Sequence, residues 1–302
     1  MIIVQLRGGL GNQLFQYAAG RRLSVKNNTK LFLDITKLST QSINKHEIFN
    51  LDKFNINAEI IESNLLNEFY SNNLLIKIIR KIKKIFNLEK YKRYFEKKMF
   101  RYDSSILNLC DNTFLWGGYW QSEKYFFDIK DIIKNELSLK NEISLKSRDT
   151  MNQIKQNLNT VSVHVRRGDY ISDKKTNSFL GTCSLDYYIN CIKILLEELV
   201  NINLFVFSDD FEWVKTNIRS DLFENPKLLN IYYVNHNNTD TAFEDMYLMS
   251  LCEHNIISNS SFSWWAAWLN NNINKKIFAP KNWIVDEKNN KLDIVPDSWR
   301  RI

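Results

Sequence analysis

The second half of the chain alternates short apolar runs with segments of helical spacing, and this alternation limits the fold more than any other feature. Five of these runs have the length and residue types of strands, and helical segments lie between them. Such alternation predicts a parallel sheet with crossover helices. The expected strands are residues 160–166, 204–210, 231–234, 255–258 and 276–279.

The first half opens in a similar way. A strand over 2–6 leads through a glycine loop into a helix over 12–24, and a second strand covers 31–34. We therefore expect an α/β protein built from two Rossmann-like domains facing across a cleft. Residues 40–150 look mainly helical, and the aromatic-rich stretch 114–126 reads as a connector.

These elements predict two domains. The N-terminal domain covers 1–155 and carries the helical insertion, and the C-terminal domain covers 156–302. The C-terminal tail is a candidate to pack back on the N-terminal domain.

Cysteine usage and hydropathy narrow the class of protein. The four cysteines contain no CxxC pair, which favours reduced, buried thiols over a disulfide framework or a zinc site. No apolar run approaches the roughly 18 residues of a membrane span, and the first residues read as a strand and not as a signal peptide. We expect a cytoplasmic protein. The cysteines are Cys110, Cys183, Cys191 and Cys252.

Positive charge is concentrated in residues 77–101, which hold eleven Lys and Arg against two Glu, a local charge of +9 in a chain of +7. Apolar residues recur between these charges at helical spacing, from Leu75 to Phe86. One interpretation is a helix packed on the core with a solvated basic face. The other is a surface that meets anionic lipid head groups, at the inner face of a membrane, or an anionic acceptor. No recognition motif accompanies the patch, so we expect no nucleic-acid partner.

The glycine loop, "RGGLGNQLFQ" over 7–16, is the first motif suited to ligand binding. Glycines such as Gly9 and Gly11 allow the backbone to turn tightly and approach a ligand, and the following helix start offers N–H groups to an anion. Asn12 and Gln13 add side-chain amides at the same place. A tight turn that binds no ligand would use the same glycines, but the two side-chain amides favour a ligand-binding loop.

The second motif is "VSVHVRRGDY", over 161–170. A strand here places His164 and Arg166 on one face, opposite the valines. Arg166, Arg167 and Asp169 come at the carboxyl end of the strand, where parallel sheets bind ligands. A guanidinium group there can bind phosphate. A local ion pair between Arg167 and Asp169 is the alternative use of that charge.

Polar residues also follow two other strands. In "SDD", over 208–210, Asp210 is expected to cap the next helix, and Asp209 to order the loops around a ligand. The stretch "SNSSFS", over 258–263, precedes a helix whose N-terminus suits phosphate. The tryptophans of 264–268 follow helical spacing and are expected in the core. No Asp-x-Asp sequence is present, so no metal site is expected.

Five stretches in this order resemble the bacterial α-1,2-fucosyltransferases, an inverting family that includes the blood-group H enzymes. They are "GGLGNQLFQYAAG", "GYWQSEKYF", "HVRRGDY", "FSDD" and "SNSSFSWWAAWL". The resemblance spans nearly the whole chain. It implies a GT-B fold and transfer of L-fucose from GDP-fucose, with inversion and without a metal or other cofactor, to the 2-hydroxyl of a terminal galactose. The acceptor would be an oligosaccharide of an O-antigen or surface glycan, with a lipid-linked form as one candidate.

The resemblance also implies roles for single residues. Arg166 and Asn12 would be catalytic, with Arg166 gripping the pyrophosphate of the donor. His164 and Asp245 would recognise the guanosine, and Arg167 and Asp169 would support the loop. The donor-binding residues would be Gly9, Gly11, Asn12, His164, Arg166, Asp209, Asp245, Asn259, Ser260, Ser261 and Phe262.

The base and the exact function each have alternatives. Asp34, at a strand end, is a candidate for the base that takes the acceptor proton, and His46 and Glu47 are further candidates. The rival functions are a fucosyltransferase of another linkage, a non-catalytic protein that binds nucleotide sugars or glycans, and a membrane-apposed scaffold using residues 77–101.

Overall fold

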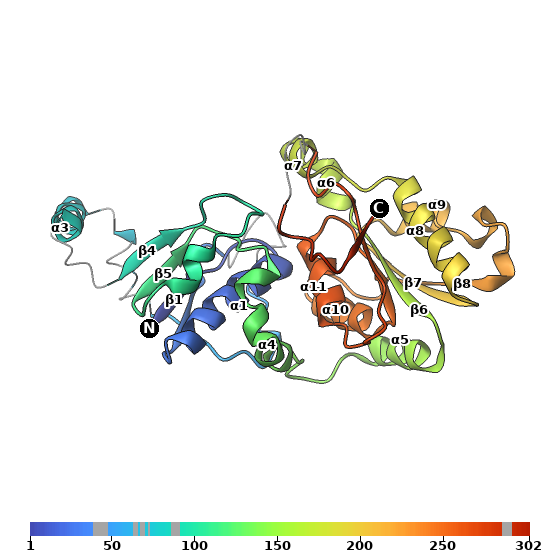
Figure 1. The fold of residues 1–302 in the computed structure, drawn as a ribbon, viewed down its shortest axis with the longest axis horizontal. Coiled ribbons are helices and arrows are strands. Elements are labelled where there is room, and N and C mark those ends of the chain that lie inside the picture. Colours follow the sequence, from blue (N-terminus) through green and yellow to red (C-terminus); the bar gives the residue numbers. More distant parts are fainter. Residues whose placement is uncertain (39–47, 63–65, 67–69, 72, 86–90, 286–291) are drawn as a thin grey trace. The chain divides into compact units, whose positions relative to one another are not determined.

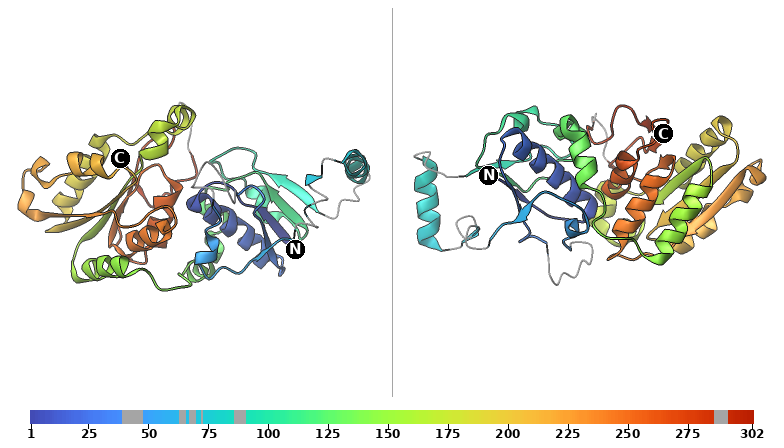
Figure 2. Two further views of the ribbon diagram at one scale, coloured as in Figure 1. Left: turned by 180° about the vertical axis from the view of Figure 1, so that it is seen from behind. Right: turned by 90° about the horizontal axis from the view of Figure 1, so that it is seen from below.

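The computed structural model describes the chain except for residues 39–47, 63–65, 67–69, 72, 86–90 and 286–291. The chain forms two compact units, Met1–Lys140 and Asn141–Ile302. Each unit is built on a parallel sheet, as the alternation of strands and helices predicts (Figure 1). Figure 2 shows the same units from behind and from below.

In the first unit, the described strands form one sheet in the order β3-β2-β1-β5-β4, and their pairings are parallel. The strands are β1 (Ile2–Gln5), β2 (Leu31–Asp34), β3 (Glu59–Ile60), β4 (Lys92–Phe95) and β5 (Thr113–Trp116). The helices are α1 (Leu10–Lys26), α3 (Leu74–Ile85) and α4 (Lys130–Glu136). Short 3-10 helices are η1 (Leu51–Lys53), η2 (Ser104–Asn108), η3 (Glu123–Tyr125) and η4 (Phe127–Ile129).

In the second unit, the described strands form one sheet in the order β11-β10-β9-β6-β7-β8, again with parallel pairings. The strands are β6 (Thr160–Val165), β7 (Ile202–Ser208), β8 (Leu229–Val234), β9 (His254–Ile256), β10 (Ile277–Ala279) and β11 (Arg300–Arg301). The helices are α5 (Leu145–Gln156), α6 (Gly168–Ser172), α7 (Lys174–Leu180), α8 (Leu185–Glu198), α9 (Phe211–Asn217), α10 (Ala242–Leu251) and α11 (Ser261–Leu269), with 3-10 helices η5 (Ser220–Leu222) and η6 (Pro226–Leu228).

All five strands expected in the second half are present. Apolar residues of β6 and β7 pack against α8 and α9 on one face of the sheet, and Figure 1 shows α10 and α11 on the other. Trp264, Trp265 and Trp268 of α11 are buried among one another, so the expectation that they belong to the core is confirmed.

The first half differs from the expectation of a mainly helical insertion. Three strands, β3, β4 and β5, lie between residues 40 and 150, and β5 takes up the first part of the expected connector. The strand β4 reads KRYF and is half-exposed or exposed along its length, so it lacks the apolar pattern of a buried strand. Helix α3 is present, but its residues Leu74, Leu75, Ile78, Ile79 and Ile82 are exposed, so the interpretation of a helix that packs this stripe on the core is wrong.

The ends of the second unit also differ from the expectation. The unit begins at Asn141, so α5 belongs to it, whereas the sequence-based boundary at 155/156 falls at the end of that helix. The C-terminal tail ends in β11, which was not among the expected strands and which pairs with β10 of its own unit. Among the cysteines, Cys191 and Cys252 are buried as expected but Cys110 is exposed, and all four are free thiols. Within the described ranges, no helix is long and apolar enough to cross a membrane.

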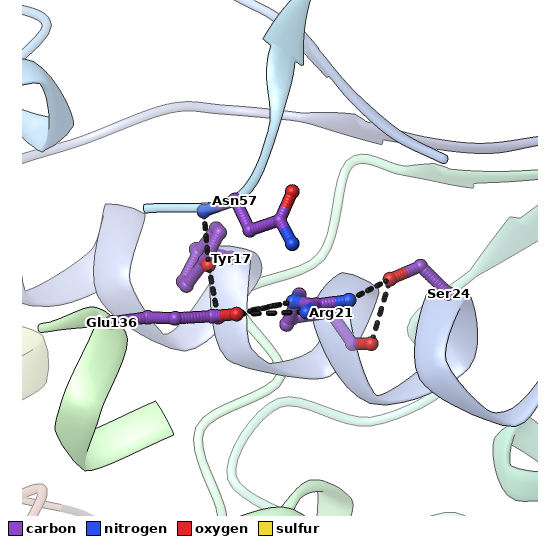
Figure 3. A network of polar contacts seen from close by, with 5 residues as sticks. All are labelled: Tyr17, Arg21, Ser24, Asn57 and Glu136. Atoms are coloured by element: carbon purple, nitrogen blue, oxygen red, sulfur yellow. Dashed lines mark hydrogen bonds and ion pairs between the residues drawn. The ribbon is translucent and has the colours of Figure 1, made fainter. Parts of the chain in front are cut away.

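A buried polar network holds α1 to α4 in the first unit (Figure 3). The Glu136 carboxylate accepts hydrogen bonds from Tyr17 Oη at 2.5 Å and from Arg21 Nε and Nη2 at 2.8–3.0 Å. Arg21 Nη1 donates to Ser24 Oγ, and the Asn57 backbone N–H donates to Tyr17 Oη. Burial, followed by the hydrogen bond to Glu136, raises the pKa of Tyr17 far above its usual value. The network fixes the orientation of α1, the helix that begins at the glycine loop.

Candidate functional site

The carboxyl end of β6 lies where the strand order of the second sheet reverses. From β6 the chain adds β7 and β8 on one side, and then returns to place β9 on the other side of β6. Open parallel sheets bind ligands outside the carboxyl ends of their strands at such a reversal. The motif residues after β6 and after β9 therefore occupy the position where this fold places a ligand site.

The two faces of β6 are divided as the alternation predicts. Val161, Val163 and Val165 join the core beside α8. Ser162 and His164 have other partners: Ser162 Oγ accepts a hydrogen bond from Asn255 Nδ2 at 2.7 Å, and His164 Nδ1 lies 3.0 Å from Ser258 Oγ. The valines anchor the strand, and the polar residues connect it to β9 and to the segment after β9.

Arg166 forms an ion pair with Asp209 just beyond the ends of β6 and β7. Arg166 Nη1 lies 3.0 Å from Asp209 Oδ2, and both side chains are mostly buried. The same carboxylate accepts hydrogen bonds from the backbone N–H groups of Arg167 and Gly168, at 2.8 and 3.1 Å. A Cβ on Gly168 would lie 2.8 Å from Asp209 Oδ2, so a larger residue here would displace that carboxylate. Asp209 therefore orders the loop after β6 and holds the guanidinium of Arg166.

Arg167 pairs with Asp210, beyond the end of β7. Its Nε donates to Asp210 Oδ2 at 3.0 Å, and its guanidinium lies 4.3 Å from the centre of the Trp213 ring. The alternative pairing of Arg167 with Asp169 is not tested, because the side chain of Asp169 lies outside the described side chains. Asp210 also accepts a hydrogen bond from Trp213 N at the start of α9, which confirms the predicted cap.

His164 is buried and uncharged. Burial, with a smaller effect of the nearby Arg166 charge, lowers its pKa to about 3. Its ring lies 5.5 Å from the Phe262 ring, between centroids, and so links β6 to the first turn of α11. A neutral imidazole can accept or donate a hydrogen bond to a ligand base without adding charge beside Arg166.

The residues at the start of α11 include two that hold the local structure together and two that are half-buried. Ser260 caps the helix by accepting from Phe262 N. Asn259 is buried, and its Nδ2 donates to the carbonyl oxygens of Leu180, Gly181 and Trp283, so its amide holds loops together. Ser261 and Phe262 are half-buried at the helix start. Of the four residues expected to contact the donor here, these two are the better placed.

Asp245 belongs to a second cluster, at the start of α10. Asn237 Nδ2 donates to Asp245 Oδ1 at 2.6 Å, and Ser147 Oγ lies 2.9 Å from His236 Nε2. Burial raises the pKa of Asp245 to about 7, although the hydrogen bond from Asn237 opposes that shift. His236 and Asn237 were not among the expected site residues. The polar run "NHNNTD" at the end of β8 is the sequence signal that points to them.

In the first unit, the glycine loop lies at the corresponding reversal, between β1 and β5. Gly8 has φ +74°, and Gly9 starts α1 without a side-chain cap. The Asn12 side chain, through Oδ1, accepts from Gln121 Nε2 at 2.7 Å, which joins this loop to the segment after β5. The Gln13 amide, expected to offer donors to a ligand, is buried and instead bonds to backbone groups of neighbouring loops.

Asp34 does not have the position expected of a base in contact with an acceptor. It is completely buried, and its two carboxylate oxygens accept hydrogen bonds from Tyr70 Oη and from Thr36. Gln5 Nε2 donates to the same Tyr70 hydroxyl. Asp34 thus positions Tyr70, whose pKa is raised by burial and by the carboxylate. His46 and Glu47, the other candidates, lie outside the described residues.

Comparison with known proteins shows the family of this chain. The sequence model of glycosyl transferase family 11 matches residues 1–302. The chain belongs to glycosyl transferase family 11. It is 35% identical over 302 residues to an α-1,2-colitosyltransferase of Escherichia coli, covering 100% of this chain and 99% of that protein. It is 31% identical over 307 residues to the O-antigen biosynthesis glycosyltransferase WbnK of E. coli, covering 97% and 98%.

More distant similarities concern part of the chain or the fold. Human galactoside α-(1,2)-fucosyltransferase 1 is 23% identical over 169 residues, covering 54% of this chain and 44% of that protein. The structure of a mutant of Arabidopsis thaliana FUT1 in complex with GDP matches with a TM-score of 0.55 and 12% identity, covering 93% of this chain and 71% of that one. This family 11 chain therefore has a GT-B-type fold with two parallel-sheet α/β units.

Proposed function

We propose that this family 11 glycosyltransferase transfers L-fucose from GDP-fucose to the 2-hydroxyl of a terminal β-galactose, with inversion, in the synthesis of an O-antigen or other surface glycan. The observation that carries the proposal is the Arg166–Asp209 pair beside the start of α11, at the reversal of the second sheet. A cytoplasmic location and a galactose-terminated oligosaccharide, lipid-linked or free, complete the proposal. Its other support is the family membership and the similarity to α-1,2-glycosyltransferases.

The leaving group explains why Arg166 matters. As the bond between fucose and phosphate breaks, negative charge grows on GDP, and a guanidinium held in place by Asp209 stabilises that charge without having to reorganise. The half-buried residues Ser261 and Phe262 lie at the N-terminus of α11, where the helix dipole adds to the same effect. We also propose Gly9, Gly11 and Asn12 as donor contacts, on the family resemblance alone.

Two polar residues of the second unit are the proposed contacts of the nucleoside. His164, uncharged at neutral pH, and Asp245 are the proposed guanosine contacts. An ionised carboxylate accepts hydrogen bonds from two adjacent N–H groups, and guanine presents such a pair on its Watson–Crick edge. Asn237 orients Asp245 through its hydrogen bond.

Charge neutralisation by protein groups supports transfer without a metal ion. Asp209, the carboxylate paired with Arg166, also accepts hydrogen bonds from two backbone N–H groups, so its charge is already compensated. Inversion requires the galactose 2-hydroxyl to attack from the side opposite the phosphate and to lose its proton during or after attack. Because Asp34 is bonded to Tyr70 and Thr36, it is not assigned as the base.

A second donor is favoured by the 35% identity to an α-1,2-colitosyltransferase. Colitose is the sugar that results when L-fucose lacks its 3-hydroxyl, and the same nucleotide site and the same linkage chemistry would serve both. A site that bonds the 3-hydroxyl would reject colitose strongly, since its buried polar groups would be left unpaired, whereas an apolar site would discriminate weakly.

A comparison of the two donors tests the proposal. Purified protein is incubated with GDP-fucose or GDP-colitose and a panel of lactose, N-acetyllactosamine and galactosyl-β-1,3-N-acetylgalactosamine, and the products are analysed by NMR. An α-1,2-fucosyl product formed faster than the colitosyl product supports the proposal. Preference for colitose, another linkage, or donor binding without transfer would each overturn it in favour of the corresponding alternative.

A further inference from the structure

Helix α3 (Leu74–Ile85) combines an apolar stripe with a high density of positive charge. Its residues Leu75, Ile78, Ile79 and Ile82 follow the i, i+3, i+4, i+7 spacing of one helix face. Lys and Arg occupy positions 77, 80, 81, 83 and 84 between them, and the helix contains no acidic residue. The arrangement is a strongly amphipathic basic helix.

The apolar stripe of α3 faces solvent. A surface helix of a globular protein normally buries such a stripe on the core. The side chains of Leu74 and Leu75 are 71% and 69% exposed, and those of Ile78, Ile79 and Ile82 are 47–50% exposed. A contiguous exposed apolar face beside charged residues marks an interaction surface.

The segment after α3 also has exposed positive charge. Lys92 and Lys98 are exposed. The carboxylate of Glu96 is used inside the unit, where it accepts from the backbone N–H groups of Tyr119 and Trp120 at 3.0 Å. Burial raises the pKa of Glu96, and the two backbone hydrogen bonds oppose that shift. The described surface from α3 to β4 is therefore predominantly positive.

We propose that α3 docks the enzyme on an anionic lipid bilayer, lying in the plane of the membrane surface. A helix of this length extends about 18 Å, which is shorter than the roughly 30 Å of a hydrocarbon core, so it cannot span. Its apolar side would enter the boundary between head groups and acyl chains, and its lysines would meet anionic head groups. A second copy of the chain fits less well, because it would bring a second basic helix against the first.

This docking goes beyond sugar transfer, and its test needs neither donor nor acceptor. The full chain is mixed with sedimentable vesicles of two compositions, phosphatidylcholine alone or phosphatidylcholine with about 30% phosphatidylglycerol. In the second, about a third of the lipid is anionic, which gives the vesicle a negative surface potential. We expect binding to the anionic vesicles only, weakened strongly in 0.5 M salt, where screening is more effective than at roughly 0.15 M. The charge variant is Lys77→Glu with Lys81→Glu, and its matched control is Lys155→Glu with Lys227→Glu, which changes the net charge equally at exposed lysines of the second unit.

The expected effects are specific to α3. Each basic residue near an anionic surface contributes about 1 kcal/mol, so losing two should weaken binding at least about 30-fold, whereas the control should change it little. The apolar variant, Ile78→Gln with Ile82→Gln, should also weaken binding at least about tenfold, and its control is Leu158→Gln with Val200→Gln, two exposed apolar residues elsewhere.

Three results would overturn the inference. The first is equal binding to neutral and anionic vesicles, and the second is an equal loss of vesicle binding in the α3 variants and in their controls. The third is that sedimentation velocity shows self-association of the chain, and that the Ile78→Gln and Ile82→Gln changes abolish it. Far-UV circular dichroism checks that each variant is folded, which the exposure of the substituted residues predicts. Transfer to soluble lactose should be unchanged in all of them, so failure of docking and failure of the proposed transferase activity are measured separately.

Discussion

Replacing Glu136 by alanine removes the centre of the network that joins α1 to α4 in the first unit. The carboxylate accepts three hydrogen bonds from Arg21 and one from Tyr17, and all three side chains are largely buried. Without it, the Arg21 charge keeps only the Ser24 hydroxyl as a side-chain partner within this network, and Tyr17 keeps only the Asn57 N–H. The substitution therefore leaves a buried charge without its counter-ion.

The loss in the free energy of unfolding follows from the burial of this ion pair. Removing one partner of a buried ion pair costs about 3–5 kcal/mol in the free energy of unfolding. Tyr17→Phe, which removes one hydrogen bond and leaves the ion pair, should cost about 1 kcal/mol. The matched control is Glu59→Ala, in the same unit, where Glu59 pairs with Lys30 on the surface with both side chains more than half exposed. An exposed pair of this kind contributes about 0–1 kcal/mol.

Guanidinium unfolding, combined with hydrogen exchange of the peptides from α1, measures these costs. Exchange assigns the loss to the first unit, which matters because a protein of two units need not unfold in one step. We expect faster exchange in α1 and a lower unfolding midpoint for Glu136→Ala, and little change for Glu59→Ala. A Glu136→Ala cost no greater than that of Glu59→Ala would refute the assignment of the network as a stabilising contact.

The remaining predictions concern the proposed active site. Arg166→Ala should lower kcat about 10²–10³-fold, the effect of losing one preordered charge-stabilising group, while circular dichroism stays unchanged; Arg219→Ala, at an exposed ion pair of the same unit, should not lower kcat. Full activity in Arg166→Ala would contradict the role given to it. Activity should persist in EDTA, and a strict requirement for added Mg²⁺ would count against charge neutralisation by Arg166. Because burial raises the pKa of Asp245 to about 7, GDP should bind more tightly as the pH rises from 6 to 8 and the carboxylate ionises; calorimetry on Asp245→Asn should show weaker binding without that pH dependence.

The strands and crossover helices of the second half could be predicted because their signals are local. Strand and helix periods of about 2 and 3.6 residues can be read from short windows, and the five predicted strands β6 to β10 are present. The position of Arg166 beyond a strand's carboxyl end follows from the same reading. The capping role of Asp210 was also predictable, because a cap depends on residues only three positions away.

Strand pairing in the first half could not be read in that way. The exposed strand β4 has no apolar alternation, and β3 is only two residues long. Both belong to the sheet through hydrogen bonds to strands that are distant in the chain, and a short window of sequence does not include those partner strands. The same limit explains the C-terminal tail, whose last residues pair with β10.

The sequence by itself determined the parallel α/β architecture, the family and the residue types at the carboxyl ends of the strands. Only the tertiary structure decided which of those residues pair: Asp209 with Arg166, Asp210 with Arg167, and Asp34 with Tyr70. It also decided that the apolar stripe of α3 faces solvent. Local periodicity specifies where a side chain points from its own element, whereas its partner depends on strand order and packing between segments far apart in the chain.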